Sequence, residues 1–126
     1  MNKKAKSETP KVFLTDRAAS DLLEIESYSI KKWGKNIATK YLAKFERVFK
    51  LLALNPDLLL PNPDLSDVLL FYRVERHLVT CVRTKAGIIV LTVTHANRDL
   101  VTLLHDLLPT LKIETAILIR KLEKSV

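Results

Sequence analysis

The sequence is poor in the residues that build disulfides, metal centres and phosphate-binding loops. Its one cysteine, Cys81, cannot form a disulfide within the chain, so a reducing compartment is the simplest expectation. One cysteine and three dispersed histidines show no paired-ligand spacing, which argues against zinc. The two glycines, Gly34 and Gly87, lie far apart, so no glycine-rich loop is available to hold a phosphate. We therefore expect no cofactor and no metal.

Long apolar runs are also missing. No stretch approaches the roughly 18 apolar residues that a membrane-spanning helix needs, because prolines interrupt the most apolar segments. Residues 1–10 are basic and polar, and they lead into no apolar segment of the kind found in signal peptides. The sequence therefore predicts a cytoplasmic protein with a flexible basic leader at residues 1–10 and no membrane partner.

Positive charge, by contrast, is in excess. The 126 residues include 21 lysines and arginines against 14 acidic residues, which gives a formal net charge of +7. A hydrophobic content of 48% is typical of a single folded domain at this length. The surplus favours an anionic partner such as nucleic acid, the ribosome or an acidic protein surface. Solvation of basic chain ends would produce the same surplus, so charge alone does not identify the partner.

The first half of the chain predicts a strand followed by two helices. Residues 11–15 (KVFLT) are short, β-branched and aromatic, which is typical of a strand. Thr15 or Asp16 can cap a helix whose apolar residues recur every three or four positions as far as Trp33–Gly34. The same periodicity resumes at once and stops at Asn55–Pro56, so we expect an antiparallel helical hairpin. Its aromatic residues lie mostly at the spacing of core residues.

The second half predicts three strands in a meander, at about 68–74, 77–84 and 88–95. Lys85–Gly87 fits a three-residue hairpin loop that pairs Thr84 with Ile88. That register places His77 opposite His95, Val79 opposite Val93 and Cys81 opposite Leu91. One sheet face then carries Val79, Cys81, Ile89, Leu91 and Val93 and takes the helices. The other face carries Thr80, Val82, Val90, Thr92 and Thr94 and could stay open to solvent.

Beyond the meander the sequence predicts two helices separated by a proline. The first is a short helix over Leu100–Leu108 that ends at Pro109, and the second runs from Thr110 to about residue 123. Apolar residues of this last helix cover more than one narrow face, which indicates burial on two sides, against the domain and against something else. The whole order predicts an α+β fold, with an N-terminal strand, an antiparallel helical hairpin, a three-stranded antiparallel meander and a C-terminal helix.

Specific residues make this order resemble the RelE/ParE toxin superfamily. The match covers about residues 11–100, and the residues 101–126 form a C-terminal helical extension beyond it. The matching residues are Leu14–Thr15, Ala18, Asp21–Leu22, Ile25, Tyr28, Trp33–Gly34, Ala38, Tyr41, Leu52–Ala53, Asn55–Pro56, Tyr72–Arg73, Arg76–His77, His95 and Arg98–Asp99.

The resemblance implies the toxin of a bacterial type II toxin–antitoxin pair, neutralised by a cognate antitoxin. ParE-like members inhibit DNA gyrase, whereas RelE-like members cut messenger RNA on the ribosome. An amphipathic helix of the antitoxin would bind across the helical hairpin or the sheet edge. The C-terminal helix could instead fill that groove or mediate a homodimer, so a homodimer and a toxin–antitoxin hetero-oligomer both remain open.

The residues available for ribonuclease chemistry favour the ParE-like alternative. Such an enzyme needs a base, an acid and cations around the phosphate. The last tyrosine, Tyr72, precedes the final strand, so His95 would have to replace a late tyrosine, with His105 a remote second choice. The catalytic candidates for a ribosome-dependent endoribonuclease would be His95, Arg98, Arg73 and Arg83. This set is thinner than a nuclease requires, and we favour inhibition of gyrase by binding.

The target-binding residues expected on this interpretation are Arg73, Arg76, His77, Arg83 and Arg98. Structural roles compete with each of them. A cross-strand His77–His95 pair is more often structural than functional, and at most one ring should be charged at neutral pH. Arg73 and Arg98 could pair with Glu75 and Asp99, and Cys81 is expected in the core. A third alternative is a non-toxic interaction module with the same fold.

Overall fold

The computed structural model describes residues 11–97 and 99–125, and it gives only the backbone of residues 111, 114 and 123–125. The basic leader and Arg98 therefore lie outside the described residues. Two long helices follow a short first strand, and the C-terminal segment forms a further long helix. The elements are β1 (Lys11–Leu14), α2 (Asp16–Trp33), α3 (Lys35–Leu54), the 3-10 turn η1 (Pro56–Leu58), β2 (Leu60–Asn62), β3 (Ser66–Val74), β4 (His77–Thr84), β5 (Gly87–His95) and α4 (Leu100–Ser125).

The five strands form one sheet in the order β1-β5-β4-β3-β2. The meander β3–β4–β5 and the short edge strand β2 are antiparallel, whereas β1 runs parallel to β5. The predicted α+β order is thus confirmed, with β2 as an added strand inside the proline-rich loop. Among the described residues no helix is long and apolar enough to cross a membrane.

The ends of the hairpin helices are where the sequence places them. The Thr15 hydroxyl oxygen accepts the Ala18 N–H at 3.0 Å and donates to the Leu91 carbonyl at 2.7 Å, so one side chain both caps α2 and ties it to β5. Gly34 ends α2 with a φ of +90°, a value that glycine adopts readily. The helix α3 ends at Leu54, directly before Asn55–Pro56.

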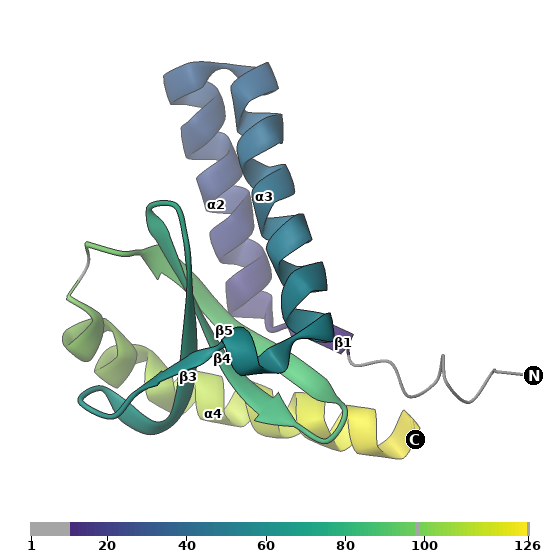
Figure 1. Ribbon diagram of the computed structural model, residues 1–126. Coiled ribbons are helices and arrows are strands. Elements are labelled where there is room, and N and C mark those ends of the chain that lie inside the picture. The colour runs from purple at the N-terminus through teal and green to yellow at the C-terminus, as the bar shows by residue number, and fades with distance from the viewer. Residues whose placement is uncertain (1–10, 98, 126) are drawn as a thin grey trace, which may run out of the picture.

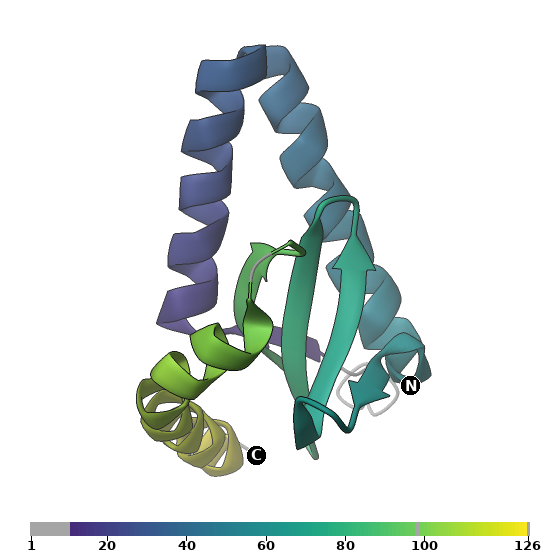
Figure 2. The same ribbon diagram turned by 90° about the vertical axis from the view of Figure 1, so that its left-hand side faces the viewer.

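The sheet is covered on both faces, so the expectation of one open face is wrong. Figure 1 shows the hairpin α2–α3 on one side of the sheet and α4 on the other. Between hairpin and sheet the core is built around Phe45, Leu52, Val79, Cys81, Ile88 and Val90. Between sheet and α4 a second cluster holds Leu69, Phe71, Ile89, Leu91 and Leu104. In Figure 2, α4 lies to one side of the sheet, below the lower end of α2.

A β-bulge between Thr80 and Cys81 explains why part of the predicted register fails. His77–His95 and Val79–Val93 pair as expected, but Cys81 lies opposite Val90 and Thr84 opposite Gly87. One extra residue on β5 reverses the side-chain alternation beyond it. Ile89 and Leu91 therefore face α4, and Val90 faces the hairpin, the reverse of the predicted faces.

The helix α4 is continuous, so the predicted break at Pro109 is also wrong. Proline inside a helix costs about 3 kcal/mol, whereas burial of one leucine or isoleucine side chain contributes about 2 kcal/mol. Leu104 and Leu107 before the proline, and Leu118 and Ile119 after it, all pack against the same cluster under the sheet. Shared burial on both sides of Pro109 outweighs the cost and keeps the two segments in one helix.

Candidate functional site

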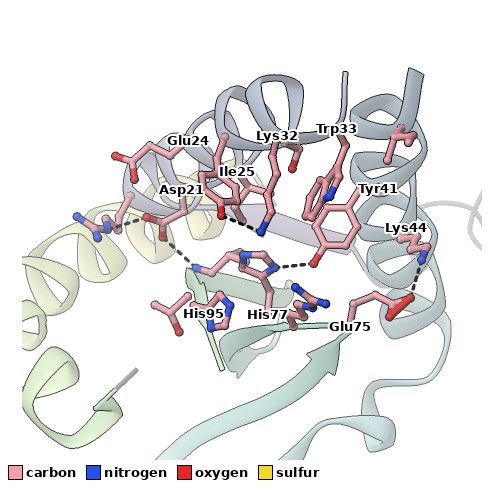
Figure 3. A pocket seen from close by; sticks show the side chains of 17 residues that line it. Asp21, Glu24, Ile25, Lys32, Trp33, Tyr41, Lys44, Glu75, His77 and His95 are labelled. Atoms are coloured by element: carbon pink, nitrogen blue, oxygen red, sulfur yellow. Dashed lines mark hydrogen bonds and ion pairs between the residues drawn. The ribbon is translucent and has the colours of Figure 1, made fainter. Parts of the chain in front are cut away.

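A pocket of about 700 Å³ opens between the helical hairpin and the ends of the central strands. Figure 3 shows side chains from α2 and α3 forming its upper walls, while the ends of β4 and β5 form its floor. The lining residues are Arg17, Asp21, Glu24, Ile25, Tyr28, Ser29, Lys32, Trp33, Ile37, Tyr41, Lys44, Glu75, Arg76, His77, Val93, Thr94 and His95.

The floor of the pocket is formed by Tyr41, which is hydrogen-bonded to His77, and by His95, whose ring contacts that of His77. The Tyr41 hydroxyl lies 2.6 Å from Nδ1 of His77, and the rings of His77 and His95 are 5.5 Å apart between centroids. Burial raises the pKa of Tyr41, while a hydrogen bond from the Arg76 backbone opposes that rise. Because the Tyr41 oxygen accepts a hydrogen bond from the Arg76 backbone, the Tyr41 hydroxyl can donate its proton to Nδ1 of His77.

These contacts keep His77 neutral at physiological pH. Burial lowers the pKa of His77, and the neighbouring His95 lowers it further. His95 is exposed, and its Nδ1 accepts the Asn97 N–H at 3.2 Å. His77 on β4 is therefore hydrogen-bonded to Tyr41 on α3 and in ring contact with His95 on β5, an arrangement suited to holding the pocket floor in place.

Aromatic and aliphatic side chains line the mouth of the pocket. Tyr28 is 59% exposed, Trp33 39% and Ile37 53%, although their spacing on the helices is that of core residues. The rings form a continuous series, from Tyr28 to Trp33 at 6.3 Å and from Trp33 to Tyr41 at 6.4 Å between centroids. Of the hairpin aromatics, Phe45 is fully buried, as expected from the sequence. The expectation of core packing is wrong for Tyr28 and Trp33, which face the pocket.

Two of the acidic side chains at the pocket are neutralised internally. The Asp21 carboxylate, only 5% exposed, lies 3.0 Å from Arg17 Nε and accepts hydrogen bonds from the Thr92 hydroxyl and the Val93 N–H. Glu75 forms an ion pair with Lys44, and this contact lowers the pKa of Glu75. Both carboxylates thus serve the structure of the site.

Two cations remain at the rim. Lys32 and Arg76 have no ion pair within the part of the chain that the structure describes. The Lys32 ammonium group donates to the Tyr28 hydroxyl at 3.3 Å and lies 5.2 Å from the Trp33 ring centre. Glu24 is the remaining carboxylate without a described ion pair. The rim therefore offers apolar surface next to positive charge.

The residues predicted for target binding or catalysis do not gather in one place. Arg76, His77 and His95 line the pocket. Arg73 lies outside it, in a hollow of about 320 Å³ between α3 and β3, where its Nε donates to the Glu75 carbonyl at 2.7 Å. Arg83 is at the opposite end of β4.

The pairings predicted for the arginines also differ from those observed. Arg83 forms an exposed ion pair with Asp57 at 3.1 Å. Arg73 contacts the backbone of Glu75 and not its carboxylate, which binds Lys44 instead. The predicted Arg98–Asp99 pair involves a residue outside the described ranges. Asp99 itself accepts from the Thr102 hydroxyl at 2.8 Å at the start of α4.

Cys81 is buried, and burial raises the pKa of its thiol to about 12, so it is no nucleophile. Within residues 11–97 and 99–125 there is no group of three metal-ligating side chains. The sequence singled out the two histidines but missed Tyr28, Lys32 and Trp33. These three residues lie near the C-terminal end of the first hairpin helix, where two aromatic residues stand beside a lysine. The same pattern occurs in helices whose aromatic residues pack in a core, so it did not indicate a pocket.

Comparison with known proteins identifies the family to which the chain belongs. Residues 12–100 match the family described as the ParE toxin of the type II toxin–antitoxin system parDE. The chain belongs to this family. Toxin ParE of Escherichia coli is 32% identical over 94 residues, which cover 74% of this chain and 91% of that protein.

A solved structure shows the same fold at lower identity. It is titled the chromosomal ParDE toxin–antitoxin system from P. aeruginosa, and it matches with a TM-score of 0.63 at 17% identity. The match covers 72% of this chain and all of the other. The family match ends at residue 100, the first residue of α4. The predicted RelE/ParE resemblance is confirmed, and the ParE branch is the one that matches.

Proposed function

We propose that the protein acts as a toxin by binding and inhibiting DNA gyrase, and that a cognate antitoxin neutralises it. Membership of the ParE family supports the choice of target. The observation that favours inhibition by binding over phosphate cleavage is that the predicted cationic side chains lie apart from one another. Arg73 and Arg83 lie in different places, each in its own contact, while His77 is neutral and hydrogen-bonded to Tyr41. A phosphate-cleaving centre needs such groups converged on one point.

A supercoiling assay with purified gyrase tests this proposal. We expect the protein to inhibit supercoiling at concentrations close to that of the enzyme, because a binding inhibitor acts stoichiometrically. Of the proposed target-binding residues, Arg76 is the first to replace, since it has no ion pair among the described residues and lines the pocket. Unchanged supercoiling at a large excess of the protein would refute the gyrase target.

The alternative, ribosome-dependent cleavage of messenger RNA, has its own test. Primer extension on translated message would map cuts if the protein were a RelE-like nuclease. In that case His95→Ala should abolish cleavage, since His95 is the exposed histidine of the pair. On our proposal no cuts appear with either the unchanged protein or the variant.

The pocket is the proposed binding site for an amphipathic segment of the antitoxin. Exposed Tyr28, Trp33 and Ile37 offer apolar contact. Lys32 and Arg76, which form no ion pair with the described residues, favour acidic side chains beside it. Antitoxin titration by calorimetry with Trp33→Ala should show at least about a tenfold loss of affinity, as is usual for a buried aromatic anchor. Leu23→Ala is the control, because Leu23 lies on the same helix, is 65% exposed and does not line the pocket.

A further inference from the structure

The helix α4 has two apolar faces, of which the sheet covers only one. Leu104, Leu107, Leu118 and Ile119 pack against the underside of the sheet. On the opposite side of the helix Ile113 is 65% exposed and Ile117 is 51% exposed. Figure 1 and Figure 2 show no other described element on that far side of α4. The exposed face lies beyond the residues that match the ParE family, which end at residue 100.

The exposed face carries charge in a symmetric arrangement. Asp106 lies seven residues before Ile113, and Arg120 lies seven residues after it. Seven residues are about two helical turns, so the three side chains share one stripe with Pro109 and Ile117 between them. All five are exposed. The stripe therefore has an acidic end, an apolar centre and a basic end.

We propose that a second copy of the chain binds this stripe, with the two α4 helices antiparallel and a two-fold axis beside Ile113. In that arrangement Asp106 of each copy lies beside Arg120 of the other, and Ile113 meets its own equivalent. Pro109 of each copy lies beside Ile117 of the other. A two-fold interface must be self-complementary, and opposite charges at equal distances on either side of an apolar centre meet that condition.

The charges on the stripe are available for this contact. Arg120 has no ion pair within the described ranges, and Asp106 has only a 3.8 Å approach to the exposed ring of its neighbour His105. A nucleic acid would require cations along the whole stripe, which Asp106 and the two isoleucines interrupt. The apolar centre is small, so the dimer should form and dissociate rapidly and be populated at high protein concentration.

Sedimentation velocity over micromolar to millimolar concentrations tests the proposal. The unchanged protein should shift from monomer towards dimer as concentration rises. Asp106→Lys and Arg120→Glu should each weaken dimerisation at least about tenfold, because each places like charges across the interface. The double variant, with both changes in one chain, should recover the dimer, since the opposite charges face each other again.

Two controls separate the interface from general effects. Lys112→Glu makes the same charge change as Arg120→Glu on an exposed position of α4 that is off the stripe, and it should leave dimerisation unchanged. Ile113→Lys should abolish the dimer. Leu23→Lys makes the same kind of change at an equally exposed residue on α2, and it should leave dimerisation unchanged. Helix content from circular dichroism checks that the variants fold. A monomer at every concentration, or no recovery in the double variant, would overturn the proposal.

Discussion

The Tyr41 hydroxyl on α3 lies 2.6 Å from Nδ1 of His77 on β4, and this contact fastens the hairpin to the sheet at the pocket floor. Tyr41→Phe removes the contact and leaves the half-buried imidazole without its partner. We expect the free energy of unfolding to fall by about 1 kcal/mol, the usual value for one hydrogen bond. Urea denaturation measures the change. Tyr28→Phe is the control, since Tyr28 is 59% exposed and its hydroxyl contacts only the Lys32 side chain among the described bonds. Equal losses in both variants would contradict this role of Tyr41.

His77 should make stability depend on pH on the acid side of neutrality. Its pKa in the folded state lies below the ordinary value of 6.5, so the unfolded chain takes up the proton more readily. Stability should be constant above pH 6.5 and should fall as the pH drops from 6.5 through the lowered pKa. Unfolding measured at several pH values, with His77→Gln beside the unchanged protein, tests this. A His77→Gln variant with the same dependence over that window would show that other groups cause it.

Asp21 is the buried carboxylate on which the α2–β5 contact depends. Asp21→Ala leaves the Thr92 hydroxyl and the Val93 N–H without an acceptor and removes the partner of Arg17. We expect a loss of about 3 kcal/mol, as is typical when one partner of a buried pair is removed. Arg17→Ala should cost much less, because Asp21 keeps its other two donors. Thermal and urea denaturation of both variants give the comparison, and a larger loss for Arg17→Ala would contradict it.

The two glycines should respond differently to alanine. A Cβ at Gly87 would lie 2.2 Å from the Lys11 carbonyl oxygen, so Gly87→Ala must push β1 away from β5. Nothing lies within 4 Å of a Cβ at Gly34, where only the positive φ opposes alanine. We expect the free energy of unfolding to fall by about 1 kcal/mol in Gly34→Ala and by clearly more in Gly87→Ala. Hydrogen exchange at the β1–β5 pairs locates the damage, and equal losses would contradict the close approach.

The sequence predicted those parts of the fold that depend on local signals. Thr15 and Gly34 mark helix ends by their own chemistry, and the apolar spacing of the hairpin is unambiguous. The bulge beyond Thr80 has no local signature, and it reversed the predicted faces for Ile89, Val90 and Leu91. The continuity of α4 through Pro109 depends on burial under the sheet, which a linear pattern does not contain.

The site was predicted less completely than the fold. The pairing of His77 with His95 follows from strand register and was predicted, because the bulge lies further along the ladder. The role of Trp33 was missed, since helical spacing cannot distinguish a side chain in the core from one facing a pocket between two layers. The separation of Arg73 from Arg83 depends on their positions at different ends of the sheet and on the partners found there.

Direct titration of purified gyrase with the protein tests the central proposal most simply. The account predicts saturable binding that weakens in Arg76→Ala, persists in Leu23→Ala, and disappears when the antitoxin is added first. It also predicts that supercoiling activity falls in proportion to the bound fraction. Absence of binding, together with cuts in translated message, would contradict it and point to the ribosome instead.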